Sequence, residues 1–544
     1  MLLTRLHSTV HAHKETTSQY RYKKLHRRTV STSCLGSSSV VFCFSLRPLC
    51  SRSISYYLSL HMAAADVSFC AISTAPVLVL QTNNEEVQTG TQSVSPYFRK
   101  QALEHQHRKE CFAAMENIFG KDSVQGDFIA INFFALEGWH LAELFQVPCV
   151  VAAPYVVPYS SPSSFERRFK IAHPLLYEQL QEDSPNKVCW RDVMHWMWPL
   201  FTERWSSWRE DCLHISPCPL TDPVTGLPIS HHWPKSPLLL YGFSKEVVEC
   251  PGYWPPNVYV CGFWFPPAEW ELPKQKGSEN SVEEPAEGES MKPMKLCLNP
   301  SIIPVRLRHF LAESSNNSCK PIFIGLSSIG SMGYIENPEG MLLSLRKILE
   351  ETSYRVIFLT AGHPPLDTAI KYFAGEFQGT CKLPDSCARD CQGISETGED
   401  GQLLLNNRLL CYAGSIPYSW LFPKCSVIIH HGGSGSTAAA LSAGLPQIIC
   451  PFTMDQFYWA ERMGWLGVAP PPLKKKHLIP DNHKDSIMEA ANALLDALNT
   501  ALSVGMRTRA ADLAGKICSE DGVRNAIDIL TKEVCVSMDL CCED

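Results

Sequence analysis

A glycine-rich turn between two apolar runs holds the residues of this 544-residue chain with the clearest chemistry. Residues 427–429, Val-Ile-Ile, are a short apolar run typical of a strand buried in a parallel sheet. The run ends in His-His-Gly-Gly-Ser-Gly-Ser-Thr at 430–437, and a helix-like run continues to residue 442. Glycines let a ligand approach the backbone, and the first N–H groups of a helix lack internal partners and lie at the positive end of its dipole. This order of parts predicts a phosphate or diphosphate site.

A second turn of the same kind follows closely. Residues 447–450 form another apolar run, Pro451 ends it, and the polar pair Asp455 and Gln456 opens a further amphipathic helix. These two side chains can hydrogen-bond to sugar hydroxyls. A lone Asp455 would be better explained as a helix N-terminal carboxylate that the dipole favours. Together, the two turns predict a pocket for a nucleotide diphosphate that carries a sugar.

Strand and helix signals alternate around these turns. In the second half of the chain the helix-like run 341–351 lies between expected strands, which we place at 322–326, 355–359, 409–412, 427–429 and 447–450. In the first half we expect strands near 128–136, 148–154 and 258–267, a helix at 137–145, and aromatic residues at helical spacing over 190–213. This rhythm predicts parallel sheets covered by helices, with ligands beyond the carboxyl ends of the strands.

Composition shifts divide the chain. We predict a basic, Ser-rich, disordered leader at 1–65, a first domain at 66–270, a charged linker at 271–300, a second domain at 301–534 and a tail at 535–544. The leader is also compatible with a plastid or mitochondrial transit peptide, or with a mis-assigned start. The formal net charge of −7 provides no basic footprint for nucleic acid, and no uninterrupted apolar run is long enough to span a membrane. Cys381, Cys387 and Cys391 lack the spacing of a zinc site and fit incidental cysteines of a surface insertion better.

Residues 430–463, HHGGSGSTAAALSAGLPQIICPFTMDQFYWAERM, resemble the donor-binding signature of UDP-sugar-dependent glycosyltransferases, above all the sterol 3-beta-glucosyltransferases of plants and fungi. The stretches PIFIGLSSIGSM, IPYSWLFPKC and EDGVRNAIDIL agree with that family, and NFFALEGWHLAELFQVPCVVAAP resembles its acceptor-side domain. The resemblance implies an α/β protein of the GT-B type, with two Rossmann-like parallel-sheet domains facing a cleft. It also implies transfer of glucose from UDP-glucose to the 3β-hydroxyl of a sterol, with inversion and without a cofactor or metal.

The same resemblance implies roles for individual residues. His431 would donate to the diphosphate and stabilise charge on the leaving UDP, while His430 completes the strand. Asp455 and Gln456 would hold the glucose hydroxyls. The remaining donor contacts would come from the loops that carry Ser328, Gly362, Gly432, Gly433, Ser434, Ser436 and Thr437. His363, next to Gly362, would approach the uracil end or would equally be a surface loop histidine.

Parts of the chain depart from the family pattern. Tyr418 and Ser419 replace a His-Asp pair common in relatives, whereas residues 420–422, Trp-Leu-Phe, are kept and should pack beneath the site. The first domain of the family opens with a strand, a Gly-Arg-Gly-Asp-like loop and a helix, and no such loop occurs before residue 132, so we expect this domain to be incomplete. An inverting transfer needs a general base near the acceptor hydroxyl. His140 matches a family position, but a structural or acceptor-lining role suits it better, and no residue is assigned as the base.

Three hypotheses therefore stay open. The chain is a sterol glucosyltransferase at the cytoplasmic face of membranes, with peripheral contact to the bilayer that holds its acceptor. Alternatively, it glucosylates another lipid or apolar acceptor, because donor motifs say little about the acceptor. In the third, it is a catalytically impaired protein that retains UDP-sugar binding.

Overall fold

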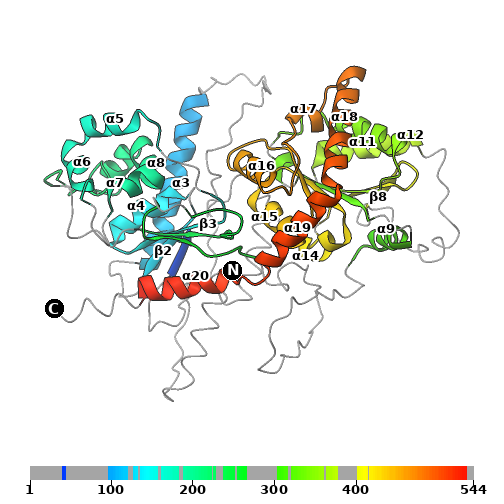
Figure 1. Cartoon of the computed structure of the whole chain (residues 1–544). Coiled ribbons are helices and arrows are strands. Elements are labelled where there is room, and N and C mark those ends of the chain that lie inside the picture. Colours follow the sequence, from blue (N-terminus) through cyan, green and yellow to red (C-terminus); the bar gives the residue numbers. More distant parts are fainter. Residues whose placement is uncertain are drawn as a thin grey trace, which may run out of the picture. The chain divides into compact units, whose positions relative to one another are not determined.

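The computed structural model describes residues 40–43, 96–119, 127–132, 135–156, 161–182, 188–222, 224–227, 237–250, 254–265, 303–316, 320–326, 328–331, 333–360, 363–377, 401–414 and 416–535 (Figure 1). It divides into two compact units: Met1–Phe265 with Asp521–Asp544, and Pro266–Glu520. Each unit contains a parallel sheet covered by helices, which confirms the predicted α/β class with two Rossmann-like domains. The linker 271–300, residues 381–391 with their three cysteines, and most of the region before 125 lie outside the described residues.

The sheet of the first unit has five parallel strands in chain order. All residues of β2, β3 and β4 are buried, which agrees with their unbroken apolar sequences. The strands are β1 (Val40–Cys43), β2 (Phe128–Ile131), β3 (Cys149–Ala153), β4 (Leu238–Tyr241) and β5 (Val258–Val260).

Strand β1 lies within residues 1–65, so the prediction of a disordered leader is wrong for these four residues. Val40 is paired with Phe128 and Cys43 with Ile131, in parallel register. The sequence Val-Val-Phe-Cys suits a strand, because β-branched and aromatic side chains fit a pleated surface. The surrounding basic, Ser-rich composition concealed this short run. Strand β4, Leu-Leu-Leu-Tyr, was missed as well.

The helices of the first unit include the predicted one at 137–145, which spans Leu136–Phe145 as α4. The aromatic region 190–213 is helical but interrupted, because Pro199 in its middle has no N–H to donate and π-helical turns replace regular ones on either side. The helical segments are α3 (Pro96–Phe119), α5 (Phe165–Ala172), α6 (Pro174–Leu180), α7 (Trp190–Asp192), η2 (Val193–Met197), α8 (Trp198–Thr202) and η3 (Trp208–Cys212).

Helix α20 (Gly522–Leu530) and the turn η8 (Thr531–Cys535) pack against one face of the first sheet (Figure 1). Val523, Ile527 and Leu530 share a core with the strands. The indole nitrogen of Trp264 donates to the carbonyl of Gly522 at 3.0 Å, and Asn525 Nδ2 donates to the carbonyl of Cys261 at 2.8 Å. The predicted second domain, 301–534, included these residues, but their apolar face is buried on the first sheet.

The six-stranded sheet of the second unit has the order β11-β10-β6-β7-β9-β8. Neighbouring strands are parallel except for β8, which is antiparallel to β9 and was not predicted. The five predicted strands of this half are all present. The strands are β6 (Ile322–Gly325), β7 (Val356–Leu359), β8 (Gln402–Leu404), β9 (Leu409–Tyr412), β10 (Val427–His430) and β11 (Gln447–Ile449).

One face of this sheet is covered by α9, α14 and α15, whose Leu307, Leu421 and Ala440 pack on strand residues such as Phe323 and Ile428. Among the described residues, no helix is long and apolar enough to cross a bilayer, and no group of three or more His, Cys, Asp or Glu side chains is placed to hold a metal ion. The helices are α9 (Val305–Asn316), α10 (Ser328–Ser331), α11 (Pro338–Glu351), α12 (Pro364–Phe377), α14 (Tyr418–Leu421), η7 (Phe422–Lys424), α15 (Ser434–Ser442), α16 (Gln456–Trp465), α17 (Lys475–Leu478), α18 (Lys484–Ala501) and α19 (Val504–Ile517).

Candidate functional site

The loops that leave β6, β7, β10 and β11 meet at one edge of the second sheet, because the carboxyl ends of parallel strands share an edge. Gly330 lies against His363, so that a Cβ added to the glycine would be 3.0 Å from the imidazole ring. The rings of Tyr334 and Phe452 are 5.9 Å apart. The sheet thus brings together segments that are far apart in the sequence.

His431 follows the last residue of β10 and has only 5% of its surface exposed. Its Nδ1 atom is buried and has no hydrogen-bond partner in the described structure. Burial lowers the pKa of His431 to about 4, partly offset by the backbone of Gly325, so the imidazole is neutral at pH 7. A buried polar atom without a partner is costly, which points to a ligand that supplies one.

His430 has a structural role at the end of β10. Its Nδ1 accepts the N–H of Gly432 at 3.0 Å, so its Nε2 carries the proton and donates to Gln447 Oε1 at 2.8 Å. Burial and, to a smaller extent, the neighbouring His431 lower the pKa of His430 to about 3. Both ring nitrogens are therefore occupied within the protein, and His430 holds the turn that positions His431.

Gly432 and Gly433 allow the turn to pass close to its neighbours. Gly432 has a φ of +85°, and a Cβ there would be 2.9 Å from the carbonyl oxygen of Gln456 and 2.9 Å from Ile449. A Cβ on Gly433 would be 2.5 Å from Nε2 of His431. The lack of a side chain at Gly432 therefore allows the turn after β10 to pack against the turn after β11. The lack of one at Gly433 leaves room for the imidazole of His431.

Helix α15 begins directly after these glycines. Its first internal hydrogen bond runs from the N–H of Thr437 to the carbonyl of Gly433 at 3.0 Å, so the N–H groups of Ser434, Gly435 and Ser436 have no acceptor within the helix. The hydroxyl of Thr437 is buried and also donates to Gly433, at 3.0 Å. The predicted role of Thr437 as a hydroxyl donor would require this bond to break, whereas the backbone donors are ready.

Ser436 is buried, and its side chain lies near the phenol of Tyr418, where it opposes the effect of burial on the pKa of that phenol. Burial raises the pKa of Tyr418 to about 12, so the phenol keeps its proton. The Tyr418 ring stacks on Phe422, with centroids 4.4 Å apart. Tyr418 therefore packs near a predicted donor contact. The sequence indicated only its departure from the pattern.

Asp455 and Gln456 lie where the second turn predicted them, at the N-cap and first residue of α16. The Oε1 atom of Gln456 accepts the N–H groups of Phe452 and Thr453 at 2.9 and 3.1 Å. These bonds hold the turn that precedes α16, in which Met454 has a φ of +55°. With its oxygen occupied, Gln456 can offer a ligand only its amide N–H groups.

The two other predicted loops are described in part. Ser328 begins the short helix α10, which follows β6, and its side chain lies outside the described residues, as does the whole of Gly362. His363 is half-buried, its Nε2 has no partner, and burial lowers its pKa. This second imidazole lies beside α10 on the same edge of the sheet as His431.

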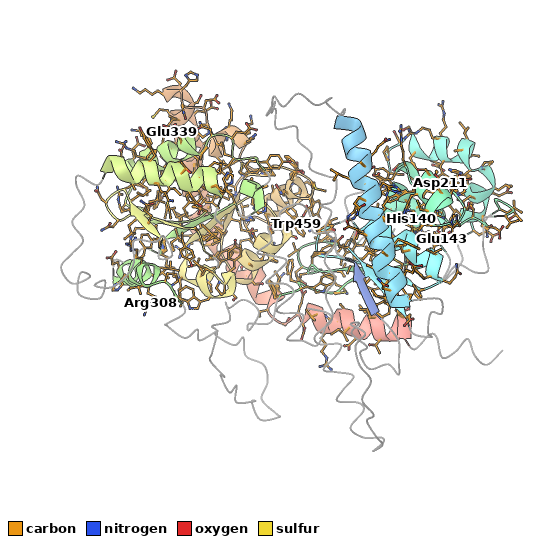
Figure 2. All side chains as sticks on the ribbon, turned by 180° about the vertical axis from the view of Figure 1, so that it is seen from behind. His140, Glu143, Asp211, Arg308, Glu339 and Trp459 are labelled. Carbon is orange, nitrogen blue, oxygen red and sulfur yellow. The ribbon has the colours of Figure 1, made fainter. Side chains whose placement is uncertain are left out.

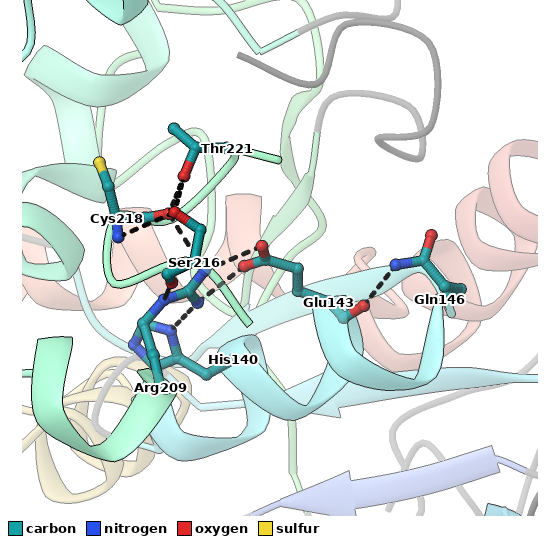
Figure 3. Close-up of polar contacts among 7 residues, drawn as sticks. All are labelled: His140, Glu143, Gln146, Arg209, Ser216, Cys218 and Thr221. Carbon is teal, nitrogen blue, oxygen red and sulfur yellow. Dashed lines mark hydrogen bonds and ion pairs between the residues drawn. The ribbon is translucent and has the colours of Figure 1, made fainter. Parts of the chain in front are cut away.

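In the first unit, His140 belongs to a buried polar network (Figures 2 and 3). Arg209 binds both carboxylate oxygens of Glu143 at 2.7 and 2.8 Å, and its NH1 donates to Nδ1 of His140 at 2.8 Å. Its remaining N–H groups donate to the carbonyls of Ser216 and Cys218, so all five guanidinium donors are used. Sequence patterns missed this network, because Arg209 is more than sixty residues from His140 and Glu143.

These contacts determine the chemistry of His140. Because Nδ1 accepts from Arg209, the proton of the neutral ring is on Nε2, which is buried without a partner. Burial, and then the charge of Arg209, lower the pKa of His140 well below its usual range. In this state neither nitrogen can take a proton from an acceptor hydroxyl, so the network favours a structural role over that of a base.

Comparisons with known proteins agree with the resemblance seen in the sequence. Residues 402–514 match the family described as Erythromycin biosynthesis protein CIII-like, C-terminal domain. The sterol 3-beta-glucosyltransferase UGT80A2 of Arabidopsis thaliana is 25% identical over 416 residues, which cover 76% of this chain and 49% of the relative. The sterol 3-beta-glucosyltransferase of Yarrowia lipolytica is 25% identical over 414 residues, or 76% of this chain and 22% of the relative.

The chain therefore spans about half, or less, of the length of these curated relatives. Among solved structures, CalG4, the calicheamicin glycosyltransferase, is similar with a TM-score of 0.46 and 13% identity, over 91% of this chain and 97% of that one. The predicted sequence resemblance to sterol 3-beta-glucosyltransferases is confirmed.

Proposed function

We propose that the second unit binds UDP-glucose at this edge and that the chain transfers the glucose, with inversion, to the 3β-hydroxyl of a sterol, forming steryl glucoside and UDP. The observation that carries the donor site is the buried, unpartnered Nδ1 of His431 beside the open N-terminus of α15. A diphosphate there would receive N–H groups of the helix and the positive end of its dipole. The similarity to sterol 3-beta-glucosyltransferases supports glucose and a sterol as the transferred group and the acceptor.

In this proposal the chain supplies the positive charge that the leaving UDP needs without a metal ion or cofactor. His431 would bind a proton as the diphosphate approaches, because a nearby anion raises the pKa of an imidazole. Gln456 would donate to glucose hydroxyls through its amide nitrogen, and Asp455 would accept from them. Peripheral contact with the cytoplasmic face of a membrane follows from the location of a sterol acceptor, and we propose it together with the acceptor.

UDP-sugar binding without transfer is the second candidate, because no residue is assigned as the general base and the contacts of His140 do not suit it to that role. That imidazole matches a position of the family's acceptor-side domain, yet Arg209 occupies Nδ1 and Nε2 carries the proton. A chain without a competent base would bind donor but leave the acceptor hydroxyl un-ionised. Transfer of glucose to a different apolar acceptor is the third candidate. The assay described next distinguishes it from the other two.

The test incubates the purified full chain with UDP-[14C]glucose and sitosterol in detergent micelles, and it measures both steryl glucoside and released UDP. Product formation supports transfer to sterol. Bound UDP-glucose without product contradicts transfer and supports the second candidate, and product with ceramide or another lipid but not with sitosterol contradicts the sterol acceptor.

Two variants test the donor site by calorimetric titration with UDP. His431→Ala should weaken UDP binding about tenfold or more, because hydrogen bonds to charged groups contribute about 1.5–3 kcal/mol. His477→Ala is the matched control, since it removes an imidazole from α17 in the same unit. Equal UDP affinity in both variants would refute the assignment of His431.

A further inference from the structure

A cavity of about 360 Å³ lies at the edge of the second sheet opposite the donor loops. Lys320 lies just before the amino end of β6, and Lys424 lies just before that of β10. The N–H of Ser426 donates to the carbonyl of Pro321 at 2.9 Å and joins the two segments. The volume is within the range of small-ligand sites. The cavity is lined by Arg308, Leu311, Ala312, Lys320, Trp420, Pro423 and Lys424.

Three cationic side chains converge on this cavity (Figure 2 labels Arg308). The Nζ atom of Lys320 donates to the carbonyl of Pro423 at 2.9 Å, and that of Lys424 donates to the carbonyl of Trp420 at 2.8 Å. These bonds hold both amino groups in place and use one of the three donors on each. Among the residues that the structure describes, none forms a hydrogen bond or ion pair with the guanidinium of Arg308.

The positive charge is not balanced within the described part of the cavity. None of its described lining residues is acidic. The acidic residue of α9, Glu313, is paired with Arg355 at 2.7 Å. Burial lowers the pKa of Lys424, and the charge of Lys320 lowers it further. An anion between these groups would relieve this repulsion and receive charge-assisted hydrogen bonds.

The rest of the lining is apolar and includes an aromatic ring. Trp420 is partly buried against the core, and Nζ of Lys424 is 4.0 Å from the centroid of its ring. Leu311, Ala312 and Pro423 complete this wall. A purely inorganic anion would leave the apolar wall uncovered, whereas an ester with an aromatic or acyl group would cover it.

From this arrangement we infer that the cavity binds a phosphate ester. Its phosphate lies among Arg308, Lys320 and Lys424, and its apolar part lies against Trp420. A soluble phosphate ester and the headgroup of an acidic phospholipid share this chemistry. The site does not depend on the donor site, because it is built at the other end of the strands.

Phenyl phosphate is the probe, and calorimetric titration of the full chain is performed in saturating UDP so that the donor loops are occupied. Arg308→Gln and Lys424→Gln should each weaken binding about tenfold, as expected for loss of a hydrogen bond to a charged group. Arg306→Gln is the matched control, because it removes the same charge from the same helix, and its guanidinium donates instead to the carbonyl of Gly401 at 2.6 Å. Trp420→Ala should remove the preference for phenyl phosphate over inorganic phosphate. Circular dichroism checks that each variant is folded.

Flotation with phosphatidic acid/phosphatidylcholine vesicles separates the two sources of phosphate. Vesicle binding that Arg308→Gln weakens and Arg306→Gln does not assigns the site to a lipid headgroup. Binding of phenyl phosphate with the same pattern, but no vesicle binding, assigns it to a soluble ester. The inference is overturned if neither ligand binds, or if Arg306→Gln and Arg308→Gln weaken binding equally.

Discussion

Replacing Gly432 with alanine tests how closely the two donor turns are packed. Its φ of +85° would cost alanine about 1–2 kcal/mol, the usual penalty of an L-residue in the left-handed region. The new Cβ would also be 2.9 Å from the carbonyl oxygen of Gln456 and from Ile449. Overlap of this kind costs about 1–3 kcal/mol, so we expect about 2–5 kcal/mol in total.

Hydrogen exchange followed by mass spectrometry measures this loss locally, in peptides that contain β10 and α15. Because about 1.4 kcal/mol changes an equilibrium tenfold, exchange through opening of this region should accelerate by about thirtyfold to a few thousandfold. Calorimetric titration with UDP should show weaker binding in parallel, because the turn carries His431. A local measurement is needed because a chain with two compact units need not unfold in one step.

Two other glycines separate the causes. Gly333 has a φ of +79° and no atom within 4 Å of an added Cβ, so Gly333→Ala reports the backbone penalty alone. Gly435 has a regular helical backbone and open space around it, so Gly435→Ala should stabilise α15 by up to about 1 kcal/mol. A Gly432→Ala variant no less stable than Gly333→Ala would refute the packing argument. A Gly432→Ala variant as stable as the native chain would refute both the backbone penalty and the overlap penalty.

Two further predictions concern buried side chains that can carry a charge. Burial lowers the pKa of folded His431 to about 4 from its ordinary value of about 6.5, so the neutral imidazole contributes stability that is complete above about pH 6.5 and is lost as the pH falls towards 4. The melting temperature should therefore drop more over this window for the native chain than for His431→Gln, and parallel profiles would contradict the burial of His431. Arg209→Met leaves Glu143 buried without its partner and should destabilise the first unit by about 3–5 kcal/mol in urea unfolding, while the exposed control Arg168→Met should change stability by less than about 0.5 kcal/mol. The double variant Arg209→Met with Glu143→Leu should recover most of the loss, and a double variant as unstable as the single one would argue against an unpaired charge as the cause.

Local sequence patterns were sufficient for the five parallel strands of the second sheet and for the donor loops. An apolar run followed by glycines and a helix-like run has few alternative structures, so β10, α15, β11 and α16 lie where we predicted them. His431 and the N-terminus of α15 are neighbours along the chain, and their proximity needs no tertiary contact. The edge strand β8 was missed because its three residues carry no pattern of their own.

The roles of individual atoms depended on partners that are distant in the sequence. Thr437 and Gln456 were predicted as ligand contacts, but Thr437 uses its hydroxyl proton and Gln456 its carbonyl oxygen within the protein. Likewise, His140 matches a family position, and only its contact with Arg209 shows which nitrogen carries the proton. Hydrogen-bond capacity is limited, so the use of a group cannot be known before its neighbours are.

The sequence by itself determined the order of strands, turns and helices around the two donor turns and the residues that form the donor loops, because periodicity and glycine conformations are local properties. The tertiary structure decided that Val40–Cys43 completes the first sheet, that α20 belongs to the first unit, and that three cationic side chains surround a cavity far from the donor loops. Those features arise from burial of apolar faces and from charges brought together across long stretches of chain. Neither the burial of an apolar face nor the meeting of distant charges can be recognised in a short window of sequence.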